Sequence, residues 1–376
     1  MTDTAATQPR DGIALCLSGG GYRAMLFHVG VLIRLNEFGI LKKLKRVSSV
    51  SGGSITAAVL GMNWKKLAFN PGGVAGNLPE LLIQPIQKMA GTTIDASAIV
   101  GGVLWRGTVA EWVSAKYADL LFGNATLQDL PDDTEGPRFV LNATNVQSGA
   151  LFRMSRPFVG DYRIGRIPHM KLPLATAVAA SSAFPPFLSP MTLDVNPADF
   201  RPDKDCDLSR RPFTDTVVLS DGGVYDNLGL ETAMKFHTLL VSDAGGKIAP
   251  EEEPASNWAE HSKRILDIVD DQVRNLRKRI LMDAFQATGA AKRAGTYWSI
   301  RSDIRDFNLP DALPCDLART TELANTPTRL KKMPETLQER LMNWGYAVAD
   351  AGIRRHAPEL SGTSPAARLP CSNAGI

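Results

Sequence analysis

Two strand-loop-helix units stand in series near the start of the chain. The first has an apolar strand over residues 12–17, a glycine loop at 18–21 and a helix over 22–38 with apolar residues every three or four positions. The second has a strand over 47–50 and a helix over 54–60. Successive units of this kind predict a parallel sheet, because each helix crosses over to start the next strand in the same direction. Both loops then lie at the carboxyl edge, where α/β sheets place their sites.

Ser51 occupies the turn between the second strand and its helix. Gly52 and Gly53 permit a tight reversal there, which directs the serine side chain outward at the sheet edge. The residues two before and two after such an elbow must be small, and here they are Ser49 and Gly53. Ser49 stands where the G-x-S-x-G pattern has glycine, yet serine is small enough to keep the turn. The spacing predicts Ser51 to be a nucleophile.

The composition is that of a globular protein. Hydrophobic residues make up 44% and charged residues 22%, which favours neither disorder nor a fibrous class. The 376 residues allow one large α/β domain with insertions or two smaller domains, and we favour one. A formal charge of +3 is too small to indicate a nucleic-acid partner. No stretch approaches the roughly 20 apolar residues that span a bilayer, and the N-terminus lacks a signal-peptide pattern.

The four cysteines are far apart and include no C-x-x-C pair, which argues against zinc and against a disulfide framework. We therefore expect a soluble or peripheral protein in a reducing cytoplasm.

Residues 62–137 give weaker signals. Helix-like stretches over 78–89 and 109–121 are separated by glycine-rich breaks, and we interpret the segment as an insertion. Two roles stay open for it: a cover that shapes an apolar pocket, or a helical layer packed on the sheet. The following elements are a β-hairpin over 139–155, an alanine-rich helix over 174–182, and strands over 216–219 and 238–241.

The most regular helical pattern covers residues 257–286. Its apolar stripe consists of Ile265, Ile268, Val269, Val273 or Gln272, Leu276, Ile280 and Leu281. Such a stripe commonly packs on a domain. The basic cluster on the same helix, Arg274, Arg277, Lys278 and Arg279, also permits a face for a membrane surface or a partner. A second helix is expected within 329–355, followed by a loose tail.

The glycines of the first loop suit an anion. Backbone N–H groups at a helix start are free to bind a phosphate, but the G-x-G-x-x-G spacing and the P-loop Lys-Ser/Thr pair are both absent. The same N–H groups equally suit the oxyanion of a tetrahedral acyl intermediate. With a serine in the neighbouring loop, an acyl-transfer site explains the sequence better than a nucleotide site.

A serine nucleophile needs a base. Of the histidines, His237, His261 and His356 come late enough for the order of a hydrolase triad, and none of them follows a strand in a turn-rich loop. Asp221 does follow an apolar strand, and it stands in a D-G-G turn. A partly desolvated carboxylate within reach of the hydroxyl can serve as a direct base. The competing interpretation is an aspartate that only makes a turn.

In this combination the chain resembles the patatin-like phospholipases, which are serine acyl hydrolases. The motifs that carry the resemblance are, in the family's order, G-G-G-Y-R at 19–23, S-V-S-G-G at 49–53, A-S-S-A-F-P-P at 180–186 and D-G-G at 221–223. The resemblance implies a three-layer α/β/α fold with a central, mostly parallel sheet. We expect a catalytic core over 12–246 that includes the insertion at 62–137. A helical extension over 247–355 would pack on it, with a tail over 356–376.

The resemblance also implies a Ser-Asp dyad without histidine, in which Ser51 is the nucleophile and Asp221 the base. The implied oxyanion hole consists of the backbone N–H groups of Gly19, Gly20, Gly21 and Gly52. The supporting residues are Arg23, Gly53, Gly222 and Gly223. For Arg23 the choices are to fix the glycine loop, to add positive potential, or to be a plain surface arginine.

The implied function is a lipid acyl hydrolase of phospholipase A or lysophospholipase type that needs no metal or cofactor. Its expected partners are a phospholipid or lysophospholipid and a membrane at its periphery, with a homodimer contact as an option for residues 247–376. Phe184, Phe187 and the insertion are candidates either for an acyl pocket or for the core. Two alternatives are a membrane-damaging effector opened by a partner or small nucleotide, and a non-catalytic lipid-binding module. The presence of both Ser51 and Asp221 speaks against the last.

Overall fold

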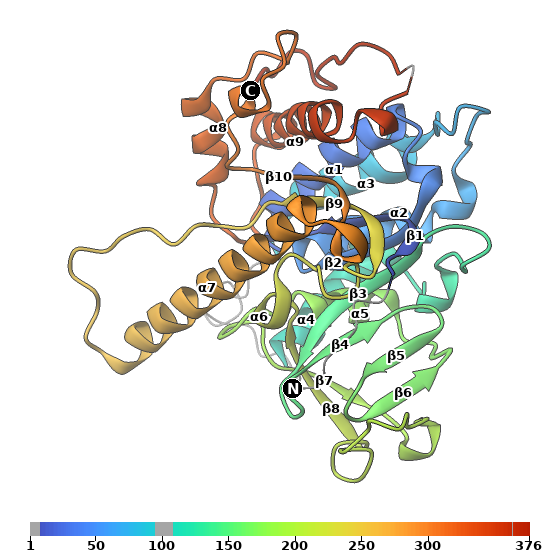
Figure 1. Cartoon of the computed structure of the whole chain (residues 1–376). Helices are drawn as coiled ribbons and strands as arrows, with labels where there is room; N and C mark the ends of the chain where they lie inside the picture. Colours follow the sequence, from blue (N-terminus) through green and yellow to red (C-terminus); the bar gives the residue numbers. More distant parts are fainter. Residues whose placement is uncertain (1–7, 95–107, 363) are drawn as a thin grey trace.

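The computed structural model describes residues 8–94, 108–362 and 364–376 (Figure 1). The strands are β1 (Arg10–Leu17), β2 (Leu44–Val50), β3 (Arg138–Asn145), β4 (Ala150–Met154), β5 (Phe158–Asp161), β6 (Gly165–Pro168), β7 (Met191–Asp194), β8 (Thr216–Asp221), β9 (Phe236–Asp243) and β10 (Ala294–Ser299). The helices are α1 (Gly21–Glu37), α2 (Gly52–Met62), α3 (Gln84–Ala90), α4 (Val109–Tyr117), α5 (Leu174–Ser181), α6 (Gly223–Asp226), α7 (Trp258–Gln286), α8 (Leu317–Ala324) and α9 (Glu335–His356).

The strands form a single ten-stranded sheet. Its main path runs β10-β9-β1-β2-β3-β4-β5-β6, with β8 pairing to β3 and β7 to β8. Neighbours from β10 to β3 are parallel, whereas β4 to β8 pair antiparallel. The predicted α/β fold with a parallel centre is confirmed, as is the hairpin, now β3 and β4. The short strands β5, β6, β7 and β10 were not expected from the sequence.

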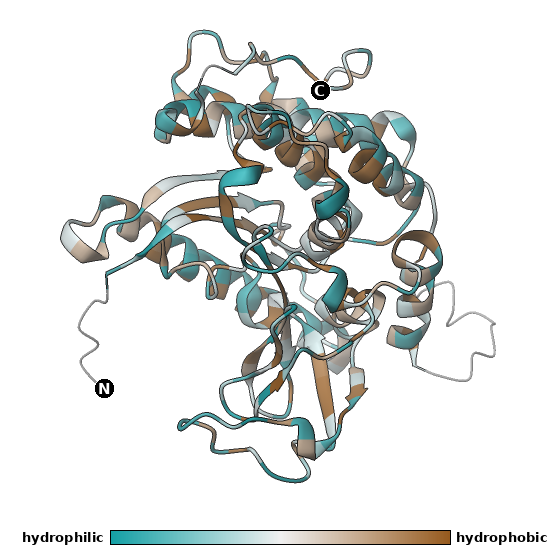
Figure 2. Cartoon of the chain, turned by 90° about the vertical axis from the view of Figure 1, so that its right-hand side faces the viewer, coloured by the Kyte–Doolittle hydropathy of each residue, from teal (hydrophilic) through white to brown (hydrophobic). Residues whose placement is uncertain are grey.

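The two faces of strand β1 contribute to two different hydrophobic clusters. Its side chains alternate between the two faces of the sheet. Leu15 and Leu17 belong to the larger core, with α1, α2 and α9, while Ala14 and Cys16 belong to a smaller cluster with Leu281 of α7. Helices therefore cover both faces of the sheet (Figure 1). Hydrophobic residues concentrate in the strands and in the inner sides of the helices above them (Figure 2).

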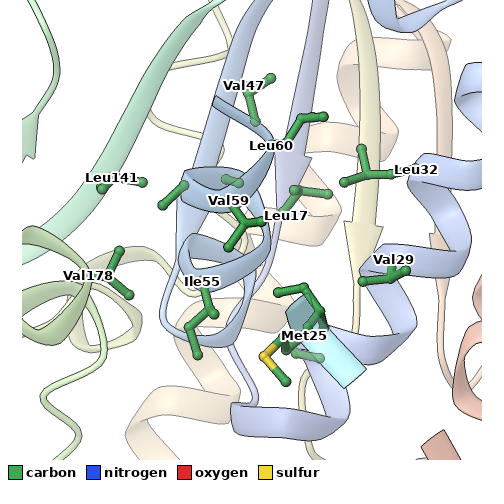
Figure 3. Close-up of a cluster of buried hydrophobic side chains, with 14 of the residues drawn as sticks. Leu17, Met25, Val29, Leu32, Val47, Ile55, Val59, Leu60, Leu141 and Val178 are labelled. Carbon is green, nitrogen blue, oxygen red and sulfur yellow. The ribbon is translucent and has the colours of Figure 1, made fainter. Parts of the chain in front are cut away.

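The larger core is densest around the first two strand-loop-helix units. Figure 3 labels Leu17, Met25, Val29, Leu32, Val47, Ile55, Val59, Leu60, Leu141 and Val178, all of them buried. The apolar spacing that predicted α1 and α2 from the sequence is thus the spacing that packs them on the parallel strands.

Helix α9 packs directly on α1. A side chain at Gly30 of α1 would overlap the backbone carbonyl of Met342, and one at Gly345 of α9 would overlap that of Phe27. The two helices are also joined by a buried ion pair between Arg34 and Asp350, 2.7 Å from nitrogen to oxygen. Residues 247–355 contribute β10 as well as helices. The proposed boundary at residue 246 remains a prediction.

The described part of the insertion contributes Leu82, Ile86, Met89, Tyr117 and Phe122 to the larger core. Its helical stretches are therefore a layer packed on the fold, and residues 95–107 of it lie outside the described residues. By contrast, Phe184 and Phe187 are 42% and 65% exposed, so neither is a core residue.

The stripe of α7 does not pack as amphipathic stripes commonly do. Among the apolar residues expected there, only Leu281 is buried, and α7 extends away from the body of the molecule (Figure 1). All four cysteines are free thiols. Within the described ranges no helix is long and apolar enough to cross a bilayer.

Candidate active site

Ser51 lies between β2 and α2 with φ +52° and ψ −122°, a conformation that non-glycine residues rarely adopt. Such strain persists only where the surroundings fix the backbone. Here the Ser51 N–H donates to the carbonyl and to the hydroxyl of Ser181, at 3.2 and 3.1 Å. Ser51 is buried, with 8% of the residue exposed. The serine stands on the sharp turn that the sequence predicted.

The glycines after Ser51 allow close approach of the first glycine loop. A side chain at Gly52 would overlap the carbonyl oxygen of Gly21, and one at Gly53 would overlap those of Leu17 and Ser18. Gly53 is therefore needed for packing, as the elbow pattern requires.

Ser49, where the elbow pattern has glycine, is accommodated by hydrogen bonds. The Ser54 hydroxyl donates to Ser49 Oγ at 3.0 Å and lies 2.8 Å from Ser181 Oγ. Ser181 in turn donates to the carbonyl of Asn142 at 2.6 Å, and Asn142 Nδ2 donates to the Ser49 carbonyl at 2.9 Å. This chain of small polar residues fixes the elbow. Sequence reasoning missed it, although Ser181 lies within the A-S-S-A-F-P-P motif.

Asp221 ends β8 and is 1% exposed. Its Oδ1 accepts a hydrogen bond from the Gly223 N–H at 2.7 Å, while Oδ2 has no hydrogen-bond partner among the described residues. Burial raises the pKa of this carboxyl to about 7, against the lowering effects of the Gly223 N–H and the Ser51 hydroxyl. No hydrogen bond of regular geometry joins the Ser51 hydroxyl to Oδ2. The free oxygen is available to take a proton.

Strand β3 brings the two residues to one edge. Val50, directly before Ser51, pairs with Asn142 of β3, and Asp221 pairs with the next residue, Ala143. Because β2 is parallel and β8 antiparallel to β3, the serine leaves its strand beside the end of β8. Residues 170 positions apart in the chain thereby meet through a single strand.

The first glycine loop lies against Ser51. The Gly19 N–H is engaged, donating to both the side-chain and main-chain oxygens of Asn227 at 3.2 Å. In the part of the chain that the structure describes, the N–H groups of Gly20, Gly21 and Gly52 have no acceptor. A side chain at Gly19 would come within 3.1 Å of Ser51 Cβ. Three of the four expected oxyanion donors are therefore unengaged, and Gly19 instead anchors the loop.

Asn227 was not singled out from the sequence. Its side chain lies beside Gly19, and a Cβ at Gly223 would come 3.0 Å from its Oδ1. Gly222 is equally restricted, since a side chain there would overlap the Asn142 carbonyl. Asn227 thus links the glycine loop to the turn that carries Asp221. The D-G-G-V-Y-D-N run was the available signal.

Arg23 is buried, and so is not a plain surface arginine. Its Nε and Nη2 donate to the Ala244 carbonyl at 3.2 and 3.0 Å, and Nη1 donates to the Thr326 carbonyl. Burial lowers its pKa to about 10, so that it stays charged at neutral pH. The arginine fixes the start of α1 to loops from two later parts of the chain.

The buried His28 does not serve Ser51. Its Nδ1 pairs with Ser242 Oγ at 2.9 Å and its Nε2 with the Ser18 carbonyl at 3.0 Å. Burial lowers its pKa to about 4, and the imidazole is neutral. His28 is thus engaged away from Ser51, whereas the pairing of β2 and β8 with β3 brings the Asp221 carboxylate to the same sheet edge as the serine.

Residues 15–234 match the model of one protein family, described as patatin-like phospholipase. Among curated protein sequences none matches the chain. Human GIVD cytosolic phospholipase A2 has a similar structure, with a TM-score of 0.53 and 13% identity over 91% of this chain and 58% of that one. VipD from Legionella pneumophila aligns with a TM-score of 0.35 and 15% identity, over 96% of this chain and 70% of that protein. The chain thus spans less than two thirds of the human enzyme, and the likeness concerns the fold.

Proposed function

The chain belongs to the patatin-like phospholipase family, and from this premise we propose that it is a lipid acyl hydrolase working through a dyad of Ser51 and Asp221. The observation that carries the proposal is the juxtaposition of a strained serine with a buried carboxylate whose Oδ2 has no hydrogen-bond partner among the described residues. A turn-making aspartate would need only Oδ1, which already binds Gly223. The second oxygen is left for chemistry.

In the first step Ser51 Oγ attacks the ester carbonyl carbon while its proton passes to Asp221. The carbonyl oxygen becomes an oxyanion, for which the unengaged N–H groups of Gly20, Gly21 and Gly52 are the donors. Asp221 then protonates the leaving alcohol as the C–O bond breaks. The product of this half-reaction is an acyl-enzyme ester on Ser51.

In the second step Asp221 takes a proton from water, and the resulting hydroxide adds to the acyl carbon. The tetrahedral intermediate collapses with return of the proton to Ser51 Oγ, which releases the fatty acid. Every proton transfer is assigned to residues of the chain, so we propose activity without metal or cofactor. A pKa of about 7 suits this exchange, because a base near the working pH can both accept and return a proton.

The substrate we propose is a glycerophospholipid or lysophospholipid. Phe184 is 42% exposed and follows Ala183, whose carbonyl accepts the Asp221 N–H at 2.9 Å. An acyl chain entering the site would therefore meet an exposed aromatic ring close to the base. Phe187, 65% exposed, extends the same apolar loop.

The experiment is fatty-acid release from mixed phospholipid vesicles in EDTA, by the wild type, Ser51→Ala and Asp221→Asn. We expect release by the wild type and a loss of about 10³-fold or more in both variants. Ser256→Ala, at an exposed serine away from the site, is the matched control and should behave as the wild type. Full activity in Ser51→Ala would refute the dyad. A silent wild type would favour the effector that awaits a partner or small nucleotide.

A further inference from the structure

Helix α7 turns an apolar stripe toward solvent. The exposed side chains, with their exposed fractions, are Trp258 83%, Ile265 46%, Val269 53%, Leu276 53% and Ile280 49%. They recur at intervals of four and seven residues and so share one side of the helix. On an ordinary surface helix this side would face the core.

The opposite, charged side holds α7 to the molecule. Arg277 Nη1 donates to Glu231 at 2.9 Å, and its Nε lies 3.5 Å from Asp226. Arg274 pairs with Asp271 on its own helix and lies 4.0 Å from Asp243. The charged groups have partners in this orientation, so turning the stripe inward would break several ion pairs. The outward orientation of the stripe is therefore the one the contacts support.

Helix α7 also lies beside the dyad. Arg277 donates to the carbonyl of Tyr225 in α6, the short helix that directly follows Asp221. Asp270, on the inner side of α7, is close enough for its charge to raise the pKa of Asp221. Figure 1 shows α7 running past α6. Whatever binds the outer stripe is thereby brought to the edge of the sheet that carries the site.

We propose that the outer stripe of α7 is a docking surface for a phospholipid membrane, which places the site at the lipid surface. The inference rests on the proposed function, because a bilayer is where a phospholipid substrate is found. Apolar side chains backed by a charged side are the pattern of helices that lie in a membrane interface, and a tryptophan such as Trp258 suits the headgroup level.

Charge on the C-terminal half of α7 favours phosphate-bearing lipid. The C-terminal half of α7, residues 273–286, has four basic residues and one acidic residue, the exposed Asp283. Arg274 and Arg277 pair with carboxylates, and Lys278 lies over the Tyr297 ring of β10, 4.6 Å from its Nζ to the ring centroid. Arg279 is the exposed basic residue beside Ile280 of the stripe. An exposed cation is attracted to an anionic membrane surface. A second copy of the chain is a different occupant, and the test below separates it from lipid.

The test measures binding without hydrolysis. Full-length protein carrying Ser51→Ala is sedimented with vesicles of phosphatidylcholine and phosphatidylglycerol, and compared with the same protein carrying in addition Val269→Ser and Leu276→Ser. The control adds Val146→Ser instead, at a residue 57% exposed on the β3–β4 turn. We expect the α7 changes to lower the partition coefficient about tenfold or more, and the control to leave it unchanged. Arg279→Gln should weaken binding to the anionic vesicles more than to pure phosphatidylcholine.

Unchanged binding by the α7 variant would overturn the inference, as would a parent protein that does not bind vesicles. Size-exclusion chromatography with light scattering, without lipid, gives the third overturning result: a dimer that Val269→Ser and Leu276→Ser dissociate. Because binding is measured in Ser51→Ala, these outcomes do not depend on catalysis. Hydrolysis lost in Ser51→Ala together with normal binding of the α7 variant would leave the dyad standing and remove only the docking surface.

Discussion

Burial of the Asp221 carboxylate favours the proposed catalysis but lowers the stability of the folded protein when the group is ionised. Its burial next to Ser51 raises its pKa to about 7, which prepares it to exchange a proton near neutral pH. The same burial penalises the ionised form in the folded state. Both consequences are measurable.

The first consequence is a pH-dependent rate. As the proposed base, Asp221 must be ionised to accept the Ser51 proton, so the base form is lost as the pH falls below its pKa of about 7. We expect kcat/KM for a short water-soluble ester to rise about tenfold per unit between pH 5 and 6.5 and to level off above pH 8. A profile that is flat from pH 5 to 8 would contradict Asp221 as the base.

The second consequence is a pH-dependent stability. Because the folded-state pKa of Asp221 lies above the unfolded value of about 3.9, protonation favours the folded state, and this stabilisation disappears as the pH rises through about 7. Asp221→Asn removes the buried charge while its amide oxygen still accepts from Gly223. We expect the variant to be inactive and yet more stable than the wild type at pH 8, by up to about 4 kcal/mol, with the difference gone near pH 3.5. Urea unfolding at the two pH values checks this, and a destabilised variant at pH 8 would be the contrary result.

At the scale of elements, the sequence could predict those helices and strands whose apolar residues in the sequence are also the residues buried in the fold. Helices α1 and α2 bury the apolar residues whose spacing predicted them, and β2 buries the apolar run before Ser51. Strands β5 and β6 have four residues each and include glycine or proline, so no alternation distinguishes them from loop. The stripe of α7 was found correctly, but the side on which it lies depends on Asp226, Asp243 and Glu231, which are distant in the sequence.

In the candidate site, too, contacts between residues that are distant in the sequence could not be predicted. Ser51 and Asp221 follow strands at glycine turns, so both could be singled out. Their distance could not, because it depends on β3 pairing in parallel with β2 and antiparallel with β8. Asn227 and Ser181 were missed for a related reason: their roles depend on hydrogen bonds to residues that are distant in the sequence.

The contact between α1 and α9 gives a prediction at this scale. Gly30 meets the backbone of Met342, and a methyl group there would force the helices apart. We expect Gly30→Ala to lower the free energy of unfolding by about 2 kcal/mol or more, against the usual benefit of alanine in a helix. Gly76→Ala is the control, since nothing lies within 4 Å of its added Cβ. Equal urea midpoints for the two variants would show that the helices are not in this close contact.

At the scale of the whole molecule, the two ends of the chain share one core. The larger cluster contains residues from Ile13 to Ile376, and β10 extends the sheet beside β9. Trp298 of β10 and Trp344 of α9 are fully buried; Trp298 donates a hydrogen bond to Ser242 of β9, and Trp344 donates one to the carbonyl of Ile300, directly after β10. By its contacts, the segment after residue 246 is thus part of the same folded unit as the residues before it.

Proteolytic cleavage in the exposed loop before α7 tests whether the segments on its two sides form one folded unit. Residues 249–254 are exposed, so a protease recognition sequence inserted between Pro250 and Glu251 should be cleaved without disturbing the fold. Because α9 packs on α1 and β10 on β9, we expect the two fragments to elute together from a size-exclusion column and to keep the esterase activity of the uncut protein. Fragments that separate, with an N-terminal piece that remains active, would instead make residues 12–246 an independent domain. The protein with the inserted sequence but without protease is the control, and it distinguishes an effect of the cut from an effect of the insertion.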